Sequence, residues 1–237
     1  MKKVLFVATV VGHINAFHIP YLKWFREQGW ETHVAAHADT EQESHISCCD
    51  VFHEVGFTRT PFTLENIKAY KVLKHLIDDN TFDIIHCHTP TGAALTRLAA
   101  RQARSSGRTK VIYTAHGFHF YKGAPLLNWL VYYPIEKFLS RYTDVLITIN
   151  KEDYNLAKNT MHAKKTEYVP GVGIDIGKIK SVSVDRGKKR AELGIPQNAF
   201  VLISVGELNK NKNHEVVVKA LSMMKENRNI HYVVAGQ

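Results

Sequence analysis

Short apolar runs alternate with amphipathic helical patterns along most of this chain, and this alternation limits the possible folds more than any other feature. Each apolar run has the length of a buried strand, and the segments between repeat apolar residues at helical spacing. Such alternation is typical of a doubly wound α/β fold, in which right-handed crossovers build a parallel sheet. We expect strands at residues 4–10, 32–36, 51–55, 84–87, 111–115, 145–149, 165–169, 200–206 and 231–235, and helices at residues 16–28, 64–79, 92–105, 124–140, 151–159 and 214–225.

The composition changes near residue 170. Residues 172–190 contain few large apolar side chains and many Gly, Lys, Ser and Asp, which is typical of a linker. A single strand–helix–strand pattern follows, and such a unit is too small to be stable without further partners. We therefore expect a Rossmann-like domain at residues 1–170, a linker at 171–198 and, at 199–237, the first β-α-β unit of a second Rossmann-like domain, so that the chain is a fragment.

The net charge of +9 suits nucleic acid, an anionic membrane surface or phosphorylated small molecules. The sequence contains no zinc-finger spacing and no RNA-recognition signature, so we expect no nucleic-acid partner. Three cysteines make no disulfide framework, and a reducing cytosol fits best. No apolar run approaches the roughly 20 residues that span a bilayer, and the apolar run after Met1-Lys-Lys is predicted to be the first strand.

Histidines stand where two predicted strands end. His86 and His88 close one strand, and His116 and His119 follow the next. Ligands of open α/β sheets bind beyond the carboxyl ends of the strands, so these residues predict a polar site. Four histidines in adjacent loops can bind a metal, but no Asp or Glu is interleaved among them. We expect substrate binding or loop support, and no metal.

Two glycine-containing turns are candidate phosphate sites. Gly12 follows the first strand, where a Rossmann fold cradles pyrophosphate, but a Gly-x-Gly-x-x-Gly motif and an acidic residue after the second strand are absent. A tight turn beneath a ligand is expected there instead of a nicotinamide site. Near residue 206, Lys210 and Lys212 precede a predicted helix, whose backbone N–H groups could bind phosphate. A solvated turn explains that segment equally well.

The predicted helix at 124–140 is rich in leucine and aromatic residues and is flanked by Lys122, Lys137 and Arg141. A helix resting on an anionic membrane has this composition, and so does a core helix with tyrosines at its rim. The core helix is the favoured interpretation.

Six segments together resemble the retaining glycosyltransferases of family 4, most closely the branch that acts in exopolysaccharide and capsule assembly. The resemblance implies a GT-B fold, in which two Rossmann-like domains face each other, the first receiving the acceptor and the second a nucleotide-diphosphate sugar. The matching segments are Leu5-Phe-Val-Ala-Thr9 with His18-Ile-Pro-Tyr-Leu22, Asp83-Ile-Ile-His-Cys-His-Thr-Pro90, Tyr113-Thr-Ala-His-Gly-Phe-His-Phe120, Ile149-Asn-Lys-Glu-Asp153, Val169-Pro-Gly-Val-Gly-Ile-Asp175 and Val205-Gly-Glu-Leu-Asn-Lys-Asn-Lys-Asn-His214.

The resemblance also implies residue roles. His116 matches the catalytic histidine that contacts the donor sugar, and residues 207–212 match the segment that faces the diphosphate. The family's arginine position holds Glu207 here, so Lys212 is the better phosphate ligand. No metal, other cofactor or protein nucleophile is implied, and the family's Glu-x7-Glu element would lie beyond Gln237. On this basis the donor-binding candidates are Gly12, Gly206, Glu207 and Lys212, and the acceptor-side or cleft candidates are His13, His88, His119 and Asn150.

The expected function is transfer of a sugar from a nucleotide-diphosphate sugar to a lipid-linked or polysaccharide acceptor in cell-surface polysaccharide synthesis. The expected location is the cytoplasm, at the inner face of the plasma membrane, with peripheral membrane contact. The fragment alone is expected to be inactive and to bind uridine diphosphate weakly or not at all. The alternatives are a non-catalytic sugar- or lipid-binding module and a histidine-dependent metallohydrolase.

Overall fold

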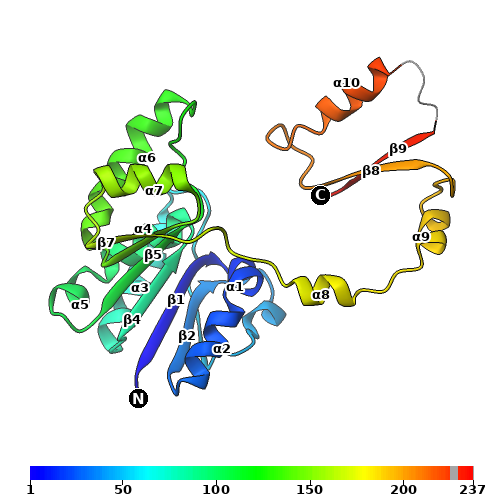
Figure 1. The fold of residues 1–237 in the computed structure, drawn as a ribbon. Coiled ribbons are helices and arrows are strands. Elements are labelled where there is room, and N and C mark those ends of the chain that lie inside the picture. Colours follow the sequence, from blue (N-terminus) through cyan, green and yellow to red (C-terminus); the bar gives the residue numbers. More distant parts are fainter. Residues whose placement is uncertain (225–228, 237) are drawn as a thin grey trace. The chain divides into compact units, whose positions relative to one another are not determined.

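A computed structural model describes residues 1–224 and 229–236, which form two compact units, Met1–Gly173 and Ile174–Gln237. The first unit is built on one seven-stranded sheet in the order β3-β2-β1-β4-β5-β6-β7, and all of its strand pairs are parallel (Figure 1). The strands are β1 (Lys3–Val10), β2 (Glu31–His37), β3 (Val51–Glu54), β4 (Ile84–His88), β5 (Lys110–Ala115), β6 (Val145–Thr148) and β7 (Lys165–Tyr168).

Helices cover both faces of this sheet. On one face, α1 (Val11–Phe17) and α2 (Ile19–Glu27) pack on a core that includes Val4, Phe6 and Val34. The opposite face is covered by α3 (Leu64–Asp79), α4 (Pro90–Ala99), α5 (Arg101–Ser105), α6 (Leu126–Leu139) and α7 (Lys151–Thr160); η1 (Glu41–Ser44) and η2 (Ser140–Tyr142) are short 3-10 turns. The predicted doubly wound α/β fold is confirmed.

The order of the strands creates a topological switch between β1 and β4. The chain runs from β1 outward to β2 and β3, then returns to β4 on the other side of β1. Val7 of β1 is in register with Cys87 of β4, so His88 lies beside the carboxyl end of β1. Ligands of open α/β sheets bind at such switch points, because the flanking connections diverge there.

The amino-terminal helix differs from its prediction. The expected helix at 16–28 is two helices, and α1 begins at Val11, directly after β1. Gly12 and His13 therefore lie in the first turn of a helix, and the tight turn predicted at Gly12 is wrong. Pro20, in the first turn of α2, is consistent with the division: proline lacks a backbone N–H and its ring favours the first turn of a helix.

One ion pair joins two helices on the face opposite α1 and α2. Arg97 of α4 is 1% exposed, and its guanidinium donates to both carboxylate oxygens of Glu136 in α6, at 2.9 and 3.0 Å. The same guanidinium lies 4.1 Å from the ring centre of Tyr113 in β5. This pair fixes α6 against α4 and the sheet.

The second unit contains a two-stranded parallel sheet of β8 (Phe200–Val205) and β9 (Ile230–Ala235), with α10 (Glu215–Met223) between them in sequence. The segment expected to be a linker also holds two short helices, α8 (Ile176–Ser181) and α9 (Arg186–Glu192). The side chain of Asp185 caps α9 by accepting the Lys188 N–H at 3.0 Å. α8 has only Ile176 and Ile179 as apolar residues and α9 only Ala191, which is too little periodicity over six and seven residues to predict a helix. No helix in residues 1–224 or 229–236 has the length and apolar character needed to cross a membrane.

Candidate active site

Three of the predicted site histidines meet at the carboxyl edge of the first sheet. His13 comes from α1, His88 ends β4 and His116 follows β5. The Nε2 atom of His13 lies 3.2 Å from Nε2 of His116, which lies 3.4 Å from Nδ1 of His88. The site is therefore located at the topological switch of the sheet.

Two further histidines complete this cluster. His18, between α1 and α2, stacks on His88 with ring centres 3.7 Å apart and planes inclined by 29°. His86 lies 4.2 Å from the His88 ring, and its Nε2 is 2.9 Å from Oγ1 of Thr114. His18 was given no role from the sequence, because only the tertiary fold brings the junction of α1 and α2 to the end of β4.

His119 lies outside the histidine cluster, although the sequence grouped it with His116. Its side chain is exposed, its ring lies 5.0 Å from that of Tyr132, and its carbonyl accepts a hydrogen bond from Asn128 at 2.8 Å. The loop between the two histidines directs their rings to different surroundings.

The clustered imidazoles are neutral at pH 7. Burial, and then repulsion from neighbouring imidazoles, lowers the pKa of His13 to about 4, that of His18 to about 2 and that of His86 to about 3. The same causes, burial first, hold the pKa of His88 well below its usual range, and burial lowers the pKa of His116. Neutral rings can donate or accept hydrogen bonds but bring no fixed charge. Among the described residues, both ring nitrogens of His18 and Nε2 of His88 are buried without a hydrogen-bond partner.

Some of these residues could hold a metal ion. His13, His18, His88 and His116 each offer one ring nitrogen, and these four atoms lie within 4.8 Å of one another. Zinc requires nitrogen lone pairs that converge on one point at about 2.0–2.1 Å. The rings of His18 and His88 are stacked, with centres 3.7 Å apart, so at least one ring would have to turn for both to bind one ion. His13, His88 and His116 are the residues best placed for one.

A hydroxyl network supports the backbone at the end of β4. Oγ1 of Thr89 accepts the N–H of Thr9 at 2.9 Å, and the N–H of Gly92 donates to Oγ1 of Thr9 at 3.2 Å. Thr89 has a φ of 62°, which is rare for a β-branched residue and is found mainly at functional sites. A Cβ atom on Gly92 would lie 3.0 Å from the Thr9 nitrogen, so glycine allows the close approach of α4 to β1.

A side chain of α7 holds the loop that carries His116 in place. Gly117 has a φ of 136°, a conformation that favours glycine. The carboxylate of Asp153, which is 3% exposed, accepts the Phe118 N–H at 3.0 Å. The side chain of Asn150 caps α7 through the Asp153 N–H and also donates to this carboxylate, each at 2.8 Å. Asn150 therefore acts on the His116 loop through Asp153, and its expected role as an acceptor-side or cleft residue stays a prediction.

The candidate phosphate residues of the second unit lie in the β8–α10 loop. Gly206 has a φ of 154°, and a Cβ built on it would lie 3.4 Å from Cγ of Lys212. The aliphatic part of the Lys212 side chain therefore packs over Gly206. The Glu207 carboxylate accepts from Asn209 at 2.8 Å, and the carbonyl of Glu207 lies 3.1 Å from Nε2 of His214. Gly12, the remaining donor candidate, is in α1 of the first unit.

Comparison with known proteins identifies the family. The glycosyl transferase 4-like family matches residues 3–150, and the glycosyl transferases group 1 family matches residues 185–237. The chain belongs to the glycosyl transferase 4-like family. This confirms the resemblance that the sequence motifs indicated.

Two curated relatives cover most of this glycosyl transferase 4-like chain. EpsD of Bacillus subtilis (strain 168), which is named as a glycosyltransferase, is 46% identical over 239 residues, covering 100% of this chain and 61% of the relative. The Escherichia coli UDP-Gal:alpha-D-GlcNAc-diphosphoundecaprenol alpha-1,3-galactosyltransferase is 30% identical over 179 residues, covering 73% of this chain and 45% of that enzyme. The chain thus spans between about half and two thirds of the length of these relatives.

Solved structures share the fold of this glycosyl transferase 4-like chain. Sucrose-phosphate synthase from Thermosynechococcus elongatus has a TM-score of 0.68 at 14% identity, covering 100% of this chain and 62% of that structure. The UDP-GlcNAc 2-epimerase from Neisseria meningitidis, solved with UDP-GlcNAc, has a TM-score of 0.64 at 16% identity, covering 98% of this chain and 64% of that structure. At such identities these likenesses establish the architecture alone.

Proposed function

We propose that this chain is part of a retaining glycosyltransferase, which transfers a sugar from a nucleotide-diphosphate sugar to a lipid-linked saccharide during cell-surface polysaccharide synthesis. Membership of the glycosyl transferase 4-like family supports the reaction class. The observation that carries the proposal is the set of neutral imidazoles around His116 at the topological switch, because they can hydrogen-bond to sugar hydroxyls without charge.

Two residues, His116 and Lys212, have a defined task in the proposed reaction. The bond between the anomeric carbon and the diphosphate breaks, the acceptor hydroxyl attacks from the same face, and its proton passes to the leaving phosphate. His116 hydrogen-bonds to the transferred sugar, and the Lys212 ammonium stabilises the charge that develops on the diphosphate. Interactions that are stronger in the transition state accelerate the reaction, and one such donor contributes roughly 3 kcal/mol.

The acceptor class is proposed from a named relative. The Escherichia coli enzyme acts on a saccharide linked to diphosphoundecaprenol, and it aligns with 73% of this chain. An isoprenoid-linked acceptor resides in a membrane, so the proposed location is the cytoplasmic membrane face. The chain's net charge of +9 favours such an anionic surface.

The test uses the longest native form of the polypeptide, assayed for transfer from UDP-sugars to an undecaprenyl-diphosphate saccharide. His116→Ala should lower kcat/KM at least about a hundredfold, as expected when a donor active in the transition state is lost. His75→Ala is the matched control, because it removes a histidine of the first unit whose side chain is 85% exposed and has no assigned role. Near-native transfer by His116→Ala would disprove the catalytic assignment.

We also propose that transfer needs no metal. Chelation should leave the transfer rate unchanged. Loss of transfer on chelation, restored by zinc, would instead support a metal at His13, His88 and His116. Zinc-dependent hydrolysis in place of transfer would favour the metallohydrolase alternative. Failure to bind any nucleotide sugar would favour a non-catalytic binding module.

A further inference from the structure

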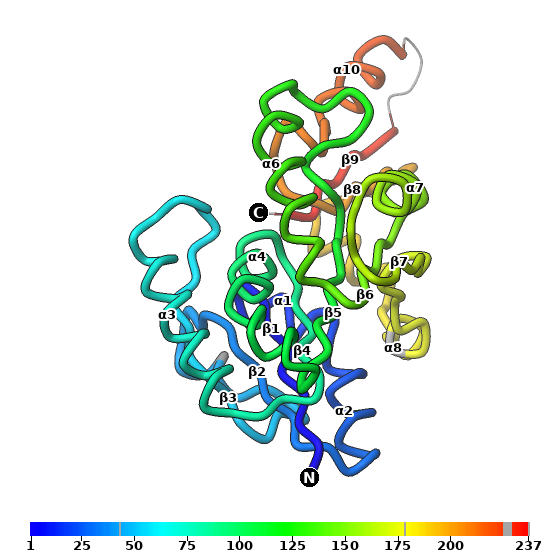
Figure 2. The backbone as a smooth tube through the Cα atoms, turned by 90° about the vertical axis from the view of Figure 1, so that its left-hand side faces the viewer, coloured from blue at the N-terminus to red at the C-terminus, as the bar shows by residue number. Residues whose placement is uncertain are grey.

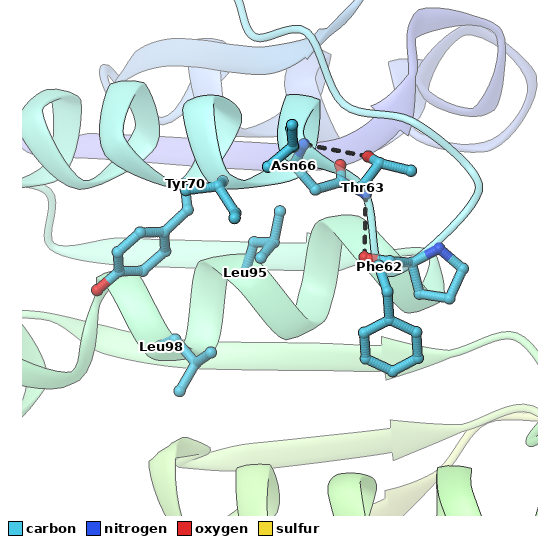
Figure 3. Close-up of a pocket in the computed structure, with 9 residues that line it drawn as sticks. Phe62, Thr63, Asn66, Tyr70, Leu95 and Leu98 are labelled. Carbon is cyan, nitrogen blue, oxygen red and sulfur yellow. Dashed lines mark hydrogen bonds between the residues drawn. The ribbon is translucent and has the colours of Figure 1, made fainter.

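An apolar pocket of about 440 Å³ opens between α3 and α4, on the sheet face opposite α1 and α2. Figure 3 shows Tyr70, Leu95 and Leu98 beside it, with Phe62 at its rim. Its volume lies within the range of about 300–1,000 Å³ that is typical of small-molecule sites. The rim residues Phe62 and Leu64 are 77% and 73% exposed. Contiguous exposed apolar side chains mark binding surfaces.

The loop that presents Phe62 is internally organised. Asn66 is 3% exposed, and its side-chain amide donates to the carbonyl of Thr60 at 2.8 Å and to Oγ1 of Thr58 at 3.0 Å. Its Oδ1 atom accepts the Thr58 N–H at 3.0 Å, and Thr63 caps α3. The buried and hydrogen-bonded Asn66 therefore fixes this loop, with the Phe62 side chain directed outward. The pocket is thus formed before a ligand binds.

The pocket and the histidine cluster both reach the carboxyl edge of the sheet, although they lie on opposite faces of it, because the His88 ring stacks on Phe6 of the α1–α2 core. α4 begins at Pro90, two residues after His88, and contributes Leu95 and Leu98 to the pocket wall. At 1.5 Å per residue, Leu95 is about 7.5 Å and Leu98 about 12 Å along the helix from Pro90. A ligand with its sugar at the half-buried His13 and His116 would therefore extend a long hydrocarbon tail over this edge to reach the pocket.

Charge around the pocket favours an anionic ligand. Residues 58–72 carry three basic side chains, Arg59, Lys68 and Lys71, against one acid, Glu65. A diphosphate between sugar and hydrocarbon would meet a positive environment here.

A second apolar tip lies on the same sheet face, at the start of α6. The residues Leu126, Leu127 and Leu130 are 72%, 67% and 65% exposed. Because α4 lies between α3 and α6 and all three follow parallel strands, their amino-terminal ends share one edge of the sheet (Figure 2). The start of α6 is therefore a second exposed apolar site at the edge where these helices begin.

We propose that the pocket between α3 and α4 binds the isoprenoid chain of a lipid-diphosphate saccharide acceptor, an assignment that rests on the proposed function. The isoprenoid chain lies against Phe62, Leu64 and Leu95. The diphosphate faces the basic side chains of residues 58–72, and the sugar reaches the histidine cluster.

The first test measures sedimentation of the chain with phosphatidylcholine vesicles that contain either undecaprenyl phosphate or phosphatidylglycerol, matched for surface charge. The chain should bind undecaprenyl phosphate vesicles at least about tenfold more tightly, and Phe62→Ser should remove that preference, because burying one large apolar side chain changes affinity about tenfold or more. Phe62 is 77% exposed, so its substitution should not disturb folding. Trp24→Ser is the matched control, because Trp24 is 53% exposed on α2, on the other sheet face. Equal binding to both kinds of vesicle, or an unchanged preference in Phe62→Ser, would overturn the assignment.

A second test separates this inference from the proposed function. The longest native form is assayed with a long-chain and a short-alkyl diphosphate saccharide. Phe62→Ser should raise KM for the long-chain acceptor about tenfold and leave the short-chain KM unchanged. If both acceptors are used equally well by both proteins, the pocket assignment is wrong and the transferase stands. If neither acceptor is used by the wild type, the proposed function is wrong. The vesicle test alone then decides whether the pocket binds an isoprenoid chain.

Discussion

Acid should destabilise the first unit in proportion to its buried neutral histidines. His18 and His88 are 4% and 0% exposed, and burial lowers the pKa values of His18 and His86 to about 2 and about 3 and that of His88 well below its usual range. In the unfolded chain these imidazoles titrate near 6.5. The unfolded state therefore binds more protons below pH 6.5, and stability falls as the pH falls from 6.5 towards the folded values.

The magnitude follows from the linkage relation. At pH 7.5 the three histidines are neutral in both states and contribute almost nothing. At pH 5.5, one unit below the unfolded pKa, each costs about 1.4 kcal/mol, so the three together cost about 4 kcal/mol. Since domains are stable by only about 5–15 kcal/mol, this loss is large.

Urea unfolding at pH 7.5 and pH 5.5, followed by tryptophan fluorescence, measures this effect. All three tryptophans, Trp24, Trp30 and Trp129, lie in the first unit, so the signal reports on that unit alone. His88→Asn should reduce the acid-induced loss by about 1.4 kcal/mol. His75→Asn is the control for removal of a histidine from the surface, because its side chain is 85% exposed. Equal stability at the two pH values would refute the argument.

Two further predictions concern charged side chains. Arg97→Met should lower the free energy of unfolding by about 3–5 kcal/mol, because it leaves the Glu136 carboxylate without its partner; urea unfolding measures this, and a loss under 1 kcal/mol would contradict it. In the longest native form, Lys212→Ala should weaken uridine diphosphate binding at least about tenfold by calorimetry, because a charge-assisted hydrogen bond contributes about 1.5–3 kcal/mol. Lys219→Ala, which removes an exposed lysine paired with Glu215, is the control, and equal affinities in the two variants would reject the role of Lys212.

Local signals predicted the elements well. The helix at 64–79 has the predicted bounds, because apolar spacing and the Thr63 cap, whose Oγ1 accepts the Asn66 N–H at 3.3 Å, agree on its start. The α1–α2 division was missed, since the apolar pattern continues through the break at His18 although Pro20 signals a helix start.

The site was predicted in part. Strand ends alone located His88 and His116, because parallel strands finish at one edge. His18 required the tertiary fold. His119 lies outside the cluster, because residues in a loop have no fixed periodicity that tells which way a side chain points, and its acceptor-side or cleft role stays a prediction.

The direct passage of β1 into α1 has a consequence for how the site can adapt. His13 is carried by a helix that starts at the residue after the strand, so its imidazole has no loop on which to shift. His116 instead begins the ten residues between β5 and α6, 116–125, which form neither helix nor strand. A ligand at this edge therefore meets one wall set by a helix and one set by a loop that α7 anchors through Asp153, and differences in substrate choice among related chains should concentrate in residues 116–125.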